Sequence, residues 1–382
     1  MTRLKLDSEH RLFCGDCLEI MKKIPSDSID SIVTDPPYGI GFLGKGWDET
    51  VPGDQFAAEA LRVLKPGGHL IAFAACRTVH RLAVALEDAG FEIRDQIAWI
   101  QWQGFPKSRD ISKALDSEAG VERTEKIGKR YKVPDTKKAN AHFINSKSGT
   151  DFTRPDEREG NHPMIEYSRT KPVTPEAIEW DGWGTQLKPA QEPAILVRKP
   201  FEGSVSQNVK KFRTGAINVD GCRMRFGDPA WPGPTDEWEG VDEPQGPSPN
   251  RKIDPILSDS MMARVSAPHE LGRFPANLYH APKPHPSQRG EANTHPTVKP
   301  VSLMRWLVRL VTPPGGTVLE PFAGSGTTVV AGHVEGFKVI SIEREPGYCD
   351  IVKSRVLEID ENIEAKRVPS AEVSGDLFGL RD

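Results

Sequence analysis

Apolar and polar residues alternate in blocks along both ends of the chain. Continuous apolar runs such as 69–75 (HLIAFAA) and 316–322 (GTVLEPF) are typical of strands buried on both faces of a sheet. Stretches such as 77–90 place their apolar residues at helical spacing and end at a glycine, a common helix stop. This alternation predicts parallel strands joined by crossover helices.

The same pattern predicts the remaining elements of the two ends. Further strands are expected at 11–15, 27–34, 91–100 and 337–343. Helices are expected at 16–24, 54–66, 301–312, 325–336 and 346–359.

The middle of the chain breaks the pattern. Residues 104–292 are rich in Pro, Gly, Ser and Asn, although 192–200 (EPAILVRKP) predicts one strand and 226–251 predicts a long loop. We therefore expect an α/β fold with one sheet assembled from residues 11–103 and 293–358. The segment 104–292 is then a large irregular insert, and 359–382 is a polar tail.

A candidate catalytic turn follows the strand predicted at 27–34. Residues 35–38 read DPPY, and because Pro36 and Pro37 lack an N–H, the strand must end there, with Asp35 and Tyr38 projecting from a stiff turn. Ligands of open α/β sheets bind at this carboxyl edge. Oxygen acceptors dominate such a turn and suit a planar amine, while Tyr38 offers a ring for stacking a base. Hydrogen bonds to both amine hydrogens favour the localised lone pair that attacks an electrophilic methyl group, without a metal or a covalent intermediate.

A second candidate site is the glycine-rich turn of 319–328 (LEPFAGSGTT). Gly324 and Gly326 allow close approach of the backbone to a ligand, and the following helix presents its N–H groups there. Glu343 ends the next strand, 19 residues after Gly324, close to the spacing at which an acidic residue binds ribose hydroxyls. The turn therefore indicates an adenosine-like cofactor. The alternative is that Glu343 only caps the helix after it.

Composition and charge narrow the class of protein. The N-terminus shows no signal-peptide pattern and no run reaches the roughly 18 apolar residues that span a bilayer, so we expect a soluble, cytoplasmic protein. The five cysteines are scattered, which argues against a disulfide framework. Cys14 and Cys17 form a single C-x-x-C without the second pair of a zinc site, which predicts two half-buried thiols, with a redox dithiol as the alternative. The net charge of −4 neither favours nor excludes nucleic acid, because binding depends on a local basic face.

Together the two motifs resemble those of the S-adenosylmethionine-dependent DNA amino-methyltransferases, which modify adenine N6 or cytosine N4. DPPY is similar to the catalytic motif of that family and EPFAGSGTT to its cofactor motif. Their order, catalytic motif first and then a long variable region, resembles the β group. The resemblance implies a Rossmann-like methyltransferase sheet with helices on both faces and a circularly permuted motif order, in which 104–292 is the target-recognition region that binds DNA.

The resemblance also assigns site residues. It implies a catalytic turn of Asp35, Pro36, Pro37 and Tyr38. It implies S-adenosylmethionine contacts from two outlying segments, CGDCLE with Asp16 and Cys17 near the adenine and HPTVKP with Thr297 and Lys299 near the methionine carboxylate. The cofactor turn would contribute the remaining contacts, from Glu320, Phe322, Gly324, Ser325, Gly326, Thr327 and Glu343. Glu320 stands where the family commonly has an aspartate. Asp16 has a second interpretation, compatible with the first, as the N-cap of the helix after it.

The implied activity is methyl transfer to the N6 amine of an adenine flipped out of duplex DNA. By the same resemblance, an aspartate in the catalytic motif favours adenine as the methylated base. Methylation of cytosine N4 is the alternative. A methyltransferase acting on RNA or a protein amide, a nicotinamide-dependent oxidoreductase and a DNA-binding module without catalysis are more distant alternatives.

Double-stranded DNA is the implied partner. Phosphate contacts are expected from two basic groups in the insert, namely Lys126, Lys129, Arg130, Lys132, Lys137 and Lys138, and Lys210, Lys211 and Arg213. Members of the β group often pair, so the resemblance allows a homodimer. A methylase with a cognate restriction enzyme, a solitary enzyme and a phage-borne enzyme would share these motifs.

Overall fold

The computed structural model describes residues 2–5, 10–41, 48, 50–101, 108–134, 164–224, 272–284, 289 and 293–366. The chain divides into two compact units. The larger unit comprises 1–100, 191–282 and 292–382, and the smaller one comprises 101–190 and 283–291.

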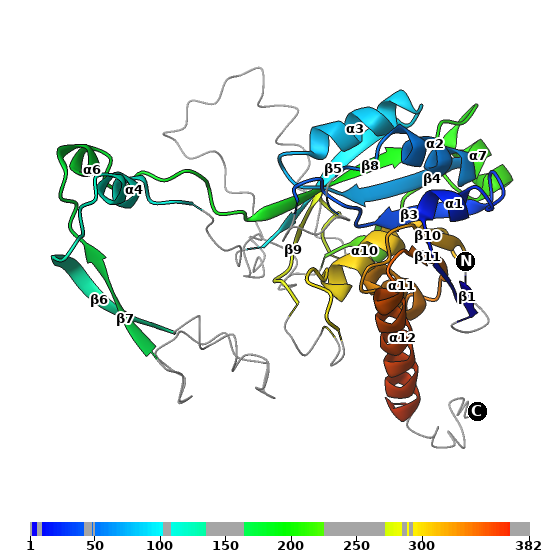
Figure 1. The fold of residues 1–382 in the computed structure, drawn as a ribbon. Helices are drawn as coiled ribbons and strands as arrows, with labels where there is room; N and C mark the ends of the chain where they lie inside the picture. Colours follow the sequence, from blue (N-terminus) through cyan, green and yellow to red (C-terminus); the bar gives the residue numbers. More distant parts are fainter. Residues whose placement is uncertain are drawn as a thin grey trace, which may run out of the picture. The chain divides into compact units, whose positions relative to one another are not determined.

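The larger unit is built on one mixed sheet (Figure 1). Its described strands are β1 (Thr2–Lys5), β2 (His10–Cys14), β3 (Ile29–Thr34), β4 (Leu64–Phe73), β5 (Glu92–Ile100), β8 (Gln191–Arg198), β9 (Leu278–His280), β10 (Thr317–Glu320) and β11 (Lys338–Glu343). Their spatial order is β1-β2-β11-β10-β3-β4-β8-β5-β9. The run from β2 to β4 is parallel, and β8 lies antiparallel between β4 and β5. The strands β11 and β10 from the C-terminal end of the chain therefore lie between β2 and β3 from the N-terminal end.

Helices cover both faces of this sheet, as the sequence predicts. The described helices of the larger unit are α1 (Cys17–Met21), α2 (Asp54–Val63), α3 (Val79–Asp88), α7 (Val205–Phe212), α10 (Val301–Val311), α11 (Thr327–Val334) and α12 (Pro346–Lys366), with a 3-10 turn at Asp220–Cys222. Figure 1 shows α1, α2 and α3 on one face and α10, α11 and α12 on the other. The predicted Rossmann-like α/β fold is confirmed.

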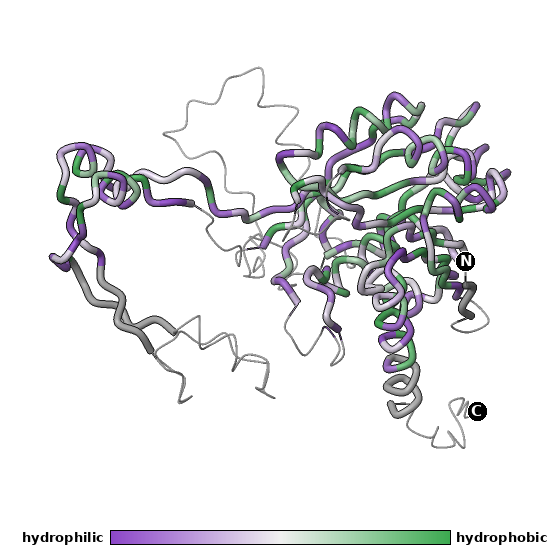
Figure 2. The backbone as a smooth tube through the Cα atoms, viewed as in Figure 1, coloured by the Kyte–Doolittle hydropathy of each residue, from purple (hydrophilic) through white to green (hydrophobic). Residues whose placement is uncertain are grey.

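The core follows the apolar blocks of the sequence. One cluster packs α1, α2 and α3 against one face of the sheet, and another packs α10 and α11 against the opposite face. Figure 2 shows the central strands and α10 as hydrophobic segments. Trp99, in β5, is 2% exposed and belongs to this core. Side-chain burial on both faces fixes the sheet in register, and this positions the loops at its carboxyl edge.

The middle segment is not one separate insert. The strand predicted at 192–200 lies at Gln191–Arg198 as β8, and β8 and β9 both belong to the main sheet. The segments 214–224 and 272–279 contain the short ordered structure that we predicted, joined by a bridge between Met224 and Arg273. Only 101–190 and 283–291 leave the larger unit. The physical reason is that an apolar strand gains most when it is buried between two others, whatever its place in the chain.

The smaller unit has its own local structure. It contains α4 (Ile111–Glu118), the antiparallel pair β6 (Lys126–Pro134) and β7 (Met164–Thr170), and α6 (Pro175–Glu179). Asp116, 1% exposed, accepts hydrogen bonds from Thr174 and Val173 and pairs with Arg123. This buried carboxylate fastens α4 to the start of α6.

Among the helices of the described residues, none has the length and apolar character that a membrane span requires.

Candidate active site

The catalytic turn leaves the sheet at the carboxyl end of β3. Thr34 ends the strand, and Asp35 to Tyr38 follow it. Asp48, which is 3% exposed, accepts the backbone N–H of Tyr38 at 2.6 Å and that of Gly39 at 3.2 Å. The two prolines and this buried carboxylate together fix the turn, so the Asp35 and Tyr38 side chains have defined directions.

Two segments distant in sequence bring charged groups to this turn. The Tyr38 hydroxyl donates to Asp35 Oδ1 at 2.8 Å, and Lys299 Nζ donates to Asp35 Oδ2 at 2.6 Å and to the Tyr38 hydroxyl at 2.9 Å. Glu192, at the start of β8, places its Oε2 atom 3.3 Å from Lys299 Nζ and 3.1 Å from the Tyr38 hydroxyl. These four side chains, Asp35, Tyr38, Glu192 and Lys299, form what we call the catalytic cluster.

The ammonium of Lys299 is the buried charge of the catalytic cluster. Its side chain is 7% exposed, and Nζ lies 4.7 Å from the centre of the Phe73 ring and 5.7 Å from that of Trp99. Burial acts to lower the pKa of Lys299, but the Asp35 and Glu192 carboxylates outweigh it and raise that pKa. Lys299 is therefore a cation at neutral pH. Burial, together with the same two carboxylates, raises the pKa of Tyr38 well above its ordinary value, so the hydroxyl keeps its proton.

The glycine turn lies at the end of the neighbouring strand, β10. Gly324 and Gly326 have φ of 52° and 78°, the left-handed region that favours glycine. A Cβ added at Gly324 would lie 3.2 Å from His295 Nε2. The Gly324 N–H donates to Glu343 Oε2 at 2.7 Å, and the Glu345 N–H donates to Glu343 Oε1 at 2.8 Å. A carboxylate has about four acceptor sites, so Glu343 retains acceptor capacity for ribose hydroxyls while it holds both backbone groups.

The two turns are linked directly through buried side chains. β3 and β10 are parallel neighbours, and the Thr34 hydroxyl donates to Glu320 Oε1. Glu320 also accepts from the Thr328 hydroxyl and from the Phe322 N–H at 3.0 Å. Burial raises the pKa of Glu320 to about 7, although these hydrogen bonds lower it. Because Thr34 precedes Asp35 and Glu320 precedes the glycine turn, one hydrogen bond spans the two motifs.

The other predicted cofactor residues take different places around this edge. Phe322 packs against the Phe56 ring, with centroids 5.3 Å apart. Ser325 and Thr327 are buried, and Arg355 of α12 donates to the Ser325 carbonyl and to the Thr327 hydroxyl. These two buried residues therefore stabilise the turn on the side that faces α12. Any contact that they make with a ligand would come from their backbone.

The segment before α10 lies over the glycine turn. His295 stacks edge-on against Tyr348 with centroids 4.5 Å apart, and its Nδ1 lies 2.5 Å from the Thr297 carbonyl. Thr297 is exposed, whereas Lys299 belongs to the catalytic cluster. The three N–H donors of Lys299 are within reach of Asp35, Tyr38 and Glu192, which points them at the catalytic turn and not at a ligand of the glycine turn.

Asp16 and Cys17 lie next to the end of β11. The Gly15 N–H donates to the Glu343 carbonyl at 2.8 Å. Asp16 is the N-cap of α1, since its Oδ1 atom accepts from Leu18 and Glu19. Cys14 and Cys17 are half-buried free thiols, as predicted, and burial raises the pKa of Cys17 to about 11, so its thiol stays protonated. Within the described residues, no group of three or more His, Cys, Asp and Glu side chains could hold a metal ion.

Two members of this site were not predicted from the sequence. Glu192 begins an apolar strand, and only the antiparallel direction of β8 brings that beginning to the carboxyl edge. Asp48 lies in a polar stretch with no pattern. The available signal was an acidic residue at the start of the one clear strand of the middle segment.

The predicted DNA contacts fall into separate places. Lys126 is exposed on β6, and Lys129, Arg130 and Lys132 lie in the same strand, where their side chains are not described; Lys137 and Lys138 lie outside the described residues. Lys210 and Lys211 lie in the last turn of α7, and Arg213 is its C-cap. Asn208 of α7 donates to the Pro66 carbonyl at the start of β4, so α7 lies at the edge opposite the catalytic turn (Figure 1). That position makes Lys210, Lys211 and Arg213 poor candidates for contacts with DNA bound at the catalytic edge.

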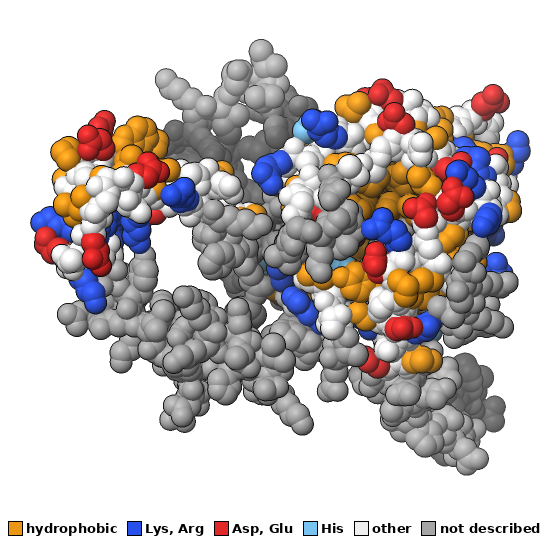
Figure 3. Space-filling model, in the orientation of Figure 1, with side chains coloured by type: hydrophobic (Ala, Val, Ile, Leu, Met, Phe, Trp, Pro, Cys, Tyr) orange, Lys and Arg blue, Asp and Glu red, His pale blue; other side chains and the backbone are white. Residues whose placement is uncertain are grey.

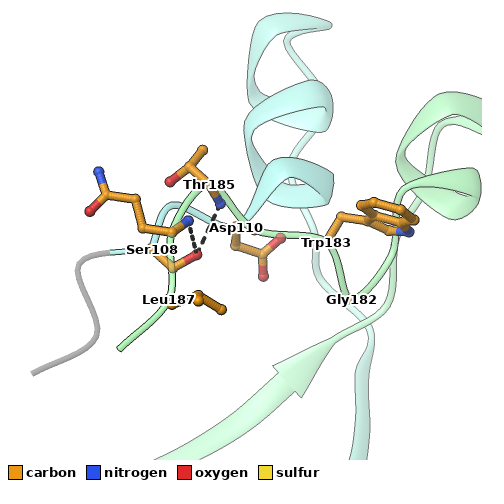
Figure 4. A pocket seen from close by; sticks show the side chains of 8 residues that line it. Ser108, Asp110, Gly182, Trp183, Thr185 and Leu187 are labelled. Atoms are coloured by element: carbon orange, nitrogen blue, oxygen red, sulfur yellow. Dashed lines mark hydrogen bonds between the residues drawn. The ribbon is translucent and has the colours of Figure 1, made fainter. Parts of the chain in front are cut away.

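The smaller unit has a pocket of about 590 Å³ (Figure 4). Its lining includes Ser108, whose hydroxyl accepts from the backbone of Thr185 and Gln186, and Trp183, which is 60% exposed. Figure 3 shows hydrophobic side chains at the surface of this unit, over α4 and α6. None of the predicted site residues lines the pocket.

Comparisons with known proteins match the chain as a whole. A family model for DNA methylases of the N6/N4 methyltransferase type matches residues 29–354. Type II methyltransferase M.HindIII of Haemophilus influenzae is 22% identical over 395 residues, which cover 92% of this chain and 96% of that protein. Type II methyltransferase M.HpaI of Haemophilus parainfluenzae is 30% identical over 116 residues, or 28% of this chain and 37% of that protein. Among solved structures, the cytosine-N4-specific PvuII DNA methyltransferase aligns with a TM-score of 0.47 and 14% identity over 93% of each chain.

Proposed function

The chain belongs to the N6/N4 DNA methylase family of S-adenosylmethionine-dependent amino-methyltransferases, and we propose that it methylates the exocyclic N6 amine of adenine in double-stranded DNA. The observation that carries the proposal is the hydrogen bond between Thr34 and Glu320. It joins the DPPY turn and the glycine turn at one edge of the sheet, which is where an amine and a methyl donor must meet. Asp35, where a serine would favour cytosine, supports adenine.

The glycine turn and its neighbours fit S-adenosylmethionine. Gly324 and Gly326 give the turn its left-handed backbone conformation, and Glu343 holds that backbone and keeps acceptor sites for a ribose. Asp16 uses Oδ1 for its cap, so its second oxygen suits the adenine amino group. Thr297 and Phe322 flank the turn. The bound cofactor would supply an electrophilic methyl group on a sulfonium.

The residues of the chain prepare the amine. The target adenine is flipped out of the duplex, because an amine inside the base stack cannot reach the site. Asp35 and the Pro36 carbonyl accept its two N–H groups, and the Tyr38 ring stacks on the base. These acceptors favour the localised lone pair and stabilise the positive charge that develops on the nitrogen during transfer. No side chain needs to form a covalent bond.

The region that selects the DNA sequence is, in this proposal, the smaller unit. It interrupts the main sheet as a separate compact unit and carries the basic strand β6. Lys126, Lys129, Arg130 and Lys132 are the proposed phosphate contacts, and with them Lys137 and Lys138 from outside the described residues. Lys210, Lys211 and Arg213 are not part of it, because α7 lies at the edge of the larger unit's sheet opposite the DPPY turn.

Two substitutions test the proposal. One should remove methyl transfer without loss of cofactor binding, and the other should remove cofactor binding itself. Asp35→Ala should leave S-adenosylmethionine binding nearly intact and remove most methyl transfer, because Asp35 contacts the amine and not the cofactor. Gly324→Val should abolish cofactor binding, because its φ of 52° and the nearby His295 ring leave no space for a branched side chain. Calorimetric titration of the cofactor and transfer of a tritiated methyl to DNA measure the two properties. Parallel loss of both in Asp35→Ala would contradict the role given to Asp35.

A further inference from the structure

Glu192 brings a second carboxylate to the catalytic cluster from a different strand. Its Oε2 atom alone makes both contacts, at 3.1 Å from the Tyr38 hydroxyl and 3.3 Å from Lys299 Nζ. Pairing of β8 with β4 fixes this place, since the Ala74 N–H donates to the Pro193 carbonyl at 2.9 Å. Glu192 is therefore held at the catalytic edge by the sheet itself.

Both oxygens of Asp35 are already engaged in this structure. Oδ1 accepts from the Tyr38 hydroxyl at 2.8 Å, and Oδ2 accepts from Lys299 at 2.6 Å. An amine that approaches Asp35 must compete with these two donors. A hydroxyl has one hydrogen, so Tyr38 can donate to Asp35 or to Glu192 at any moment. Glu192 is thus an alternative acceptor for both groups that occupy Asp35.

The charge balance of the catalytic cluster also depends on Glu192. Asp35 and Lys299 alone would form a neutral pair, which does little for the positive charge that develops on the amine nitrogen. With Glu192, two carboxylates face one ammonium, and one negative charge remains. The side chains of Lys299, Glu192 and Asp35 are only 7%, 21% and 25% exposed, so this charge is weakly screened by solvent.

We infer that Glu192 is a positioning residue for the methyl transfer step. It accepts the Lys299 ammonium and the Tyr38 hydroxyl when Asp35 turns to the amine of the target base, and it leaves the catalytic cluster with a net negative charge. Phe73, Trp99 and Tyr38 surround the ammonium and hold it between the two carboxylates throughout. The inference rests on the proposed function, in which Asp35 binds the amine, and Glu192 touches neither base nor cofactor.

Glu192→Gln tests the charge of this side chain without changing its shape. The amide oxygen can still accept from Lys299, so a purely structural role would be preserved. We expect the dissociation constant of S-adenosylmethionine to stay within about twofold, and the single-turnover rate at saturating cofactor to fall by about tenfold to a hundredfold. Glu192→Asp keeps the charge with a shorter reach and should give an intermediate rate. The substrate is duplex DNA from a methylation-deficient bacterial host.

Asp27→Asn is the matched control. Asp27 is also a carboxylate paired with a lysine, Lys199 at 2.6 Å, but it lies before β3 at the opposite edge of the sheet. Its φ of 54° is one that asparagine tolerates. This variant loses the same charge and should methylate DNA at the wild-type rate.

A double-mutant cycle with Lys299→Met gives the sharpest result. If Glu192 offsets the charge of Lys299, removal of Lys299 should reduce the rate less in the Glu192→Gln background than in the wild type. Additive losses, or a wild-type rate in Glu192→Gln, would overturn the inference while the wild-type enzyme remains active. A wild-type protein that transfers no methyl group to DNA would instead overturn the proposed function.

Discussion

Glu320 is a carboxyl group buried between the two motifs, at 1% exposure. Its side chain accepts three hydrogen bonds, yet burial still raises its pKa to about 7 from an ordinary 4.5. An aspartate is one methylene shorter and would have less reach from β10 towards Thr34. The longer side chain of Glu320 joins the motifs, and it makes the junction sensitive to pH.

The pH dependence of stability follows from this pKa shift. Between pH 4.5 and about 7 the folded protein keeps a proton on Glu320 that the unfolded chain releases, so a rise in pH favours unfolding. The free energy of unfolding of the wild type, relative to Glu320→Gln, should fall across this window by at most about 1.4 kcal/mol per pH unit. Denaturant titrations of both proteins at pH 5, 6, 7 and 8 measure the difference. A constant difference would mean that Glu320 titrates normally.

Some residues of the site can be identified from the local sequence, and others cannot. Asp35, Tyr38, Gly324 and Glu343 follow apolar strands in motifs whose chemistry is readable. No local motif identifies Glu192 as a site residue, because its position depends on which strands β8 pairs with and in which direction. Pairing is a property of the whole sheet, and the sequence of one strand does not contain it.

At the scale of elements, the glycine turn is held by α12. Gly326 has φ of 78°, and an added Cβ would lie 3.0 Å from the side chain of Val352 and 3.2 Å from its Cα. Arg355, one turn further along α12, donates to the Ser325 carbonyl at 2.7 Å. The shape of the cofactor turn therefore depends on packing against a helix that contributes no predicted ligand contact.

Gly326→Ala should show this dependence. Gly336 is the matched control, because its φ of 76° is nearly the same but an added Cβ would meet nothing within 4 Å. Both alanine variants have the backbone strain, and only Gly326→Ala also displaces α12. We expect Gly326→Ala to lower the free energy of unfolding by about 1 to 3 kcal/mol more than Gly336→Ala. Equal losses in thermal or denaturant unfolding would show that contact with α12 is unimportant.

The strands and helices around the main sheet could be predicted because their buried side chains give a clear pattern of apolar positions along the sequence. Strands β3, β4, β5, β10 and β11, with α2, α3, α10 and α11, lie within a few residues of their predicted places. Helices α4, α6 and α7 and the pair β6 and β7 were not predicted. They have few apolar residues and bury them against local partners, so the period that marks an element is weak.

At the scale of the whole molecule, basic residues occur in separate groups. The group on β6 belongs to the smaller unit, and the group at the end of α7 lies at the edge of the larger unit opposite the catalytic turn. The net charge of −4 gives no indication of where these basic groups lie. Affinity for DNA is expected from one group and not from the other.

The dependence of DNA binding on salt separates the two groups. Neutral polar replacement of Lys126, Lys129, Arg130 and Lys132 should make the slope of log affinity against log salt shallower by about 3.6, because each of the four phosphate contacts contributes about 0.9. Replacement of Lys210, Lys211 and Arg213 should leave the slope unchanged. Titration of labelled duplex at several salt concentrations gives both slopes. A shallower slope after replacement of Lys210, Lys211 and Arg213 alone would instead indicate that DNA binds at the edge of the sheet where α7 lies.

In the proposed function, Asp35 and the glycine turn act together in the methylation of an adenine amine in DNA. The most direct test of this proposal is to incubate the protein with S-adenosylmethionine and unmethylated duplex DNA, digest the DNA to nucleosides and identify the modified base by mass spectrometry. We predict N6-methyladenine with the wild type and a strongly reduced amount with Asp35→Ala. N4-methylcytosine as the product, or DNA without any added methyl group, would contradict the account.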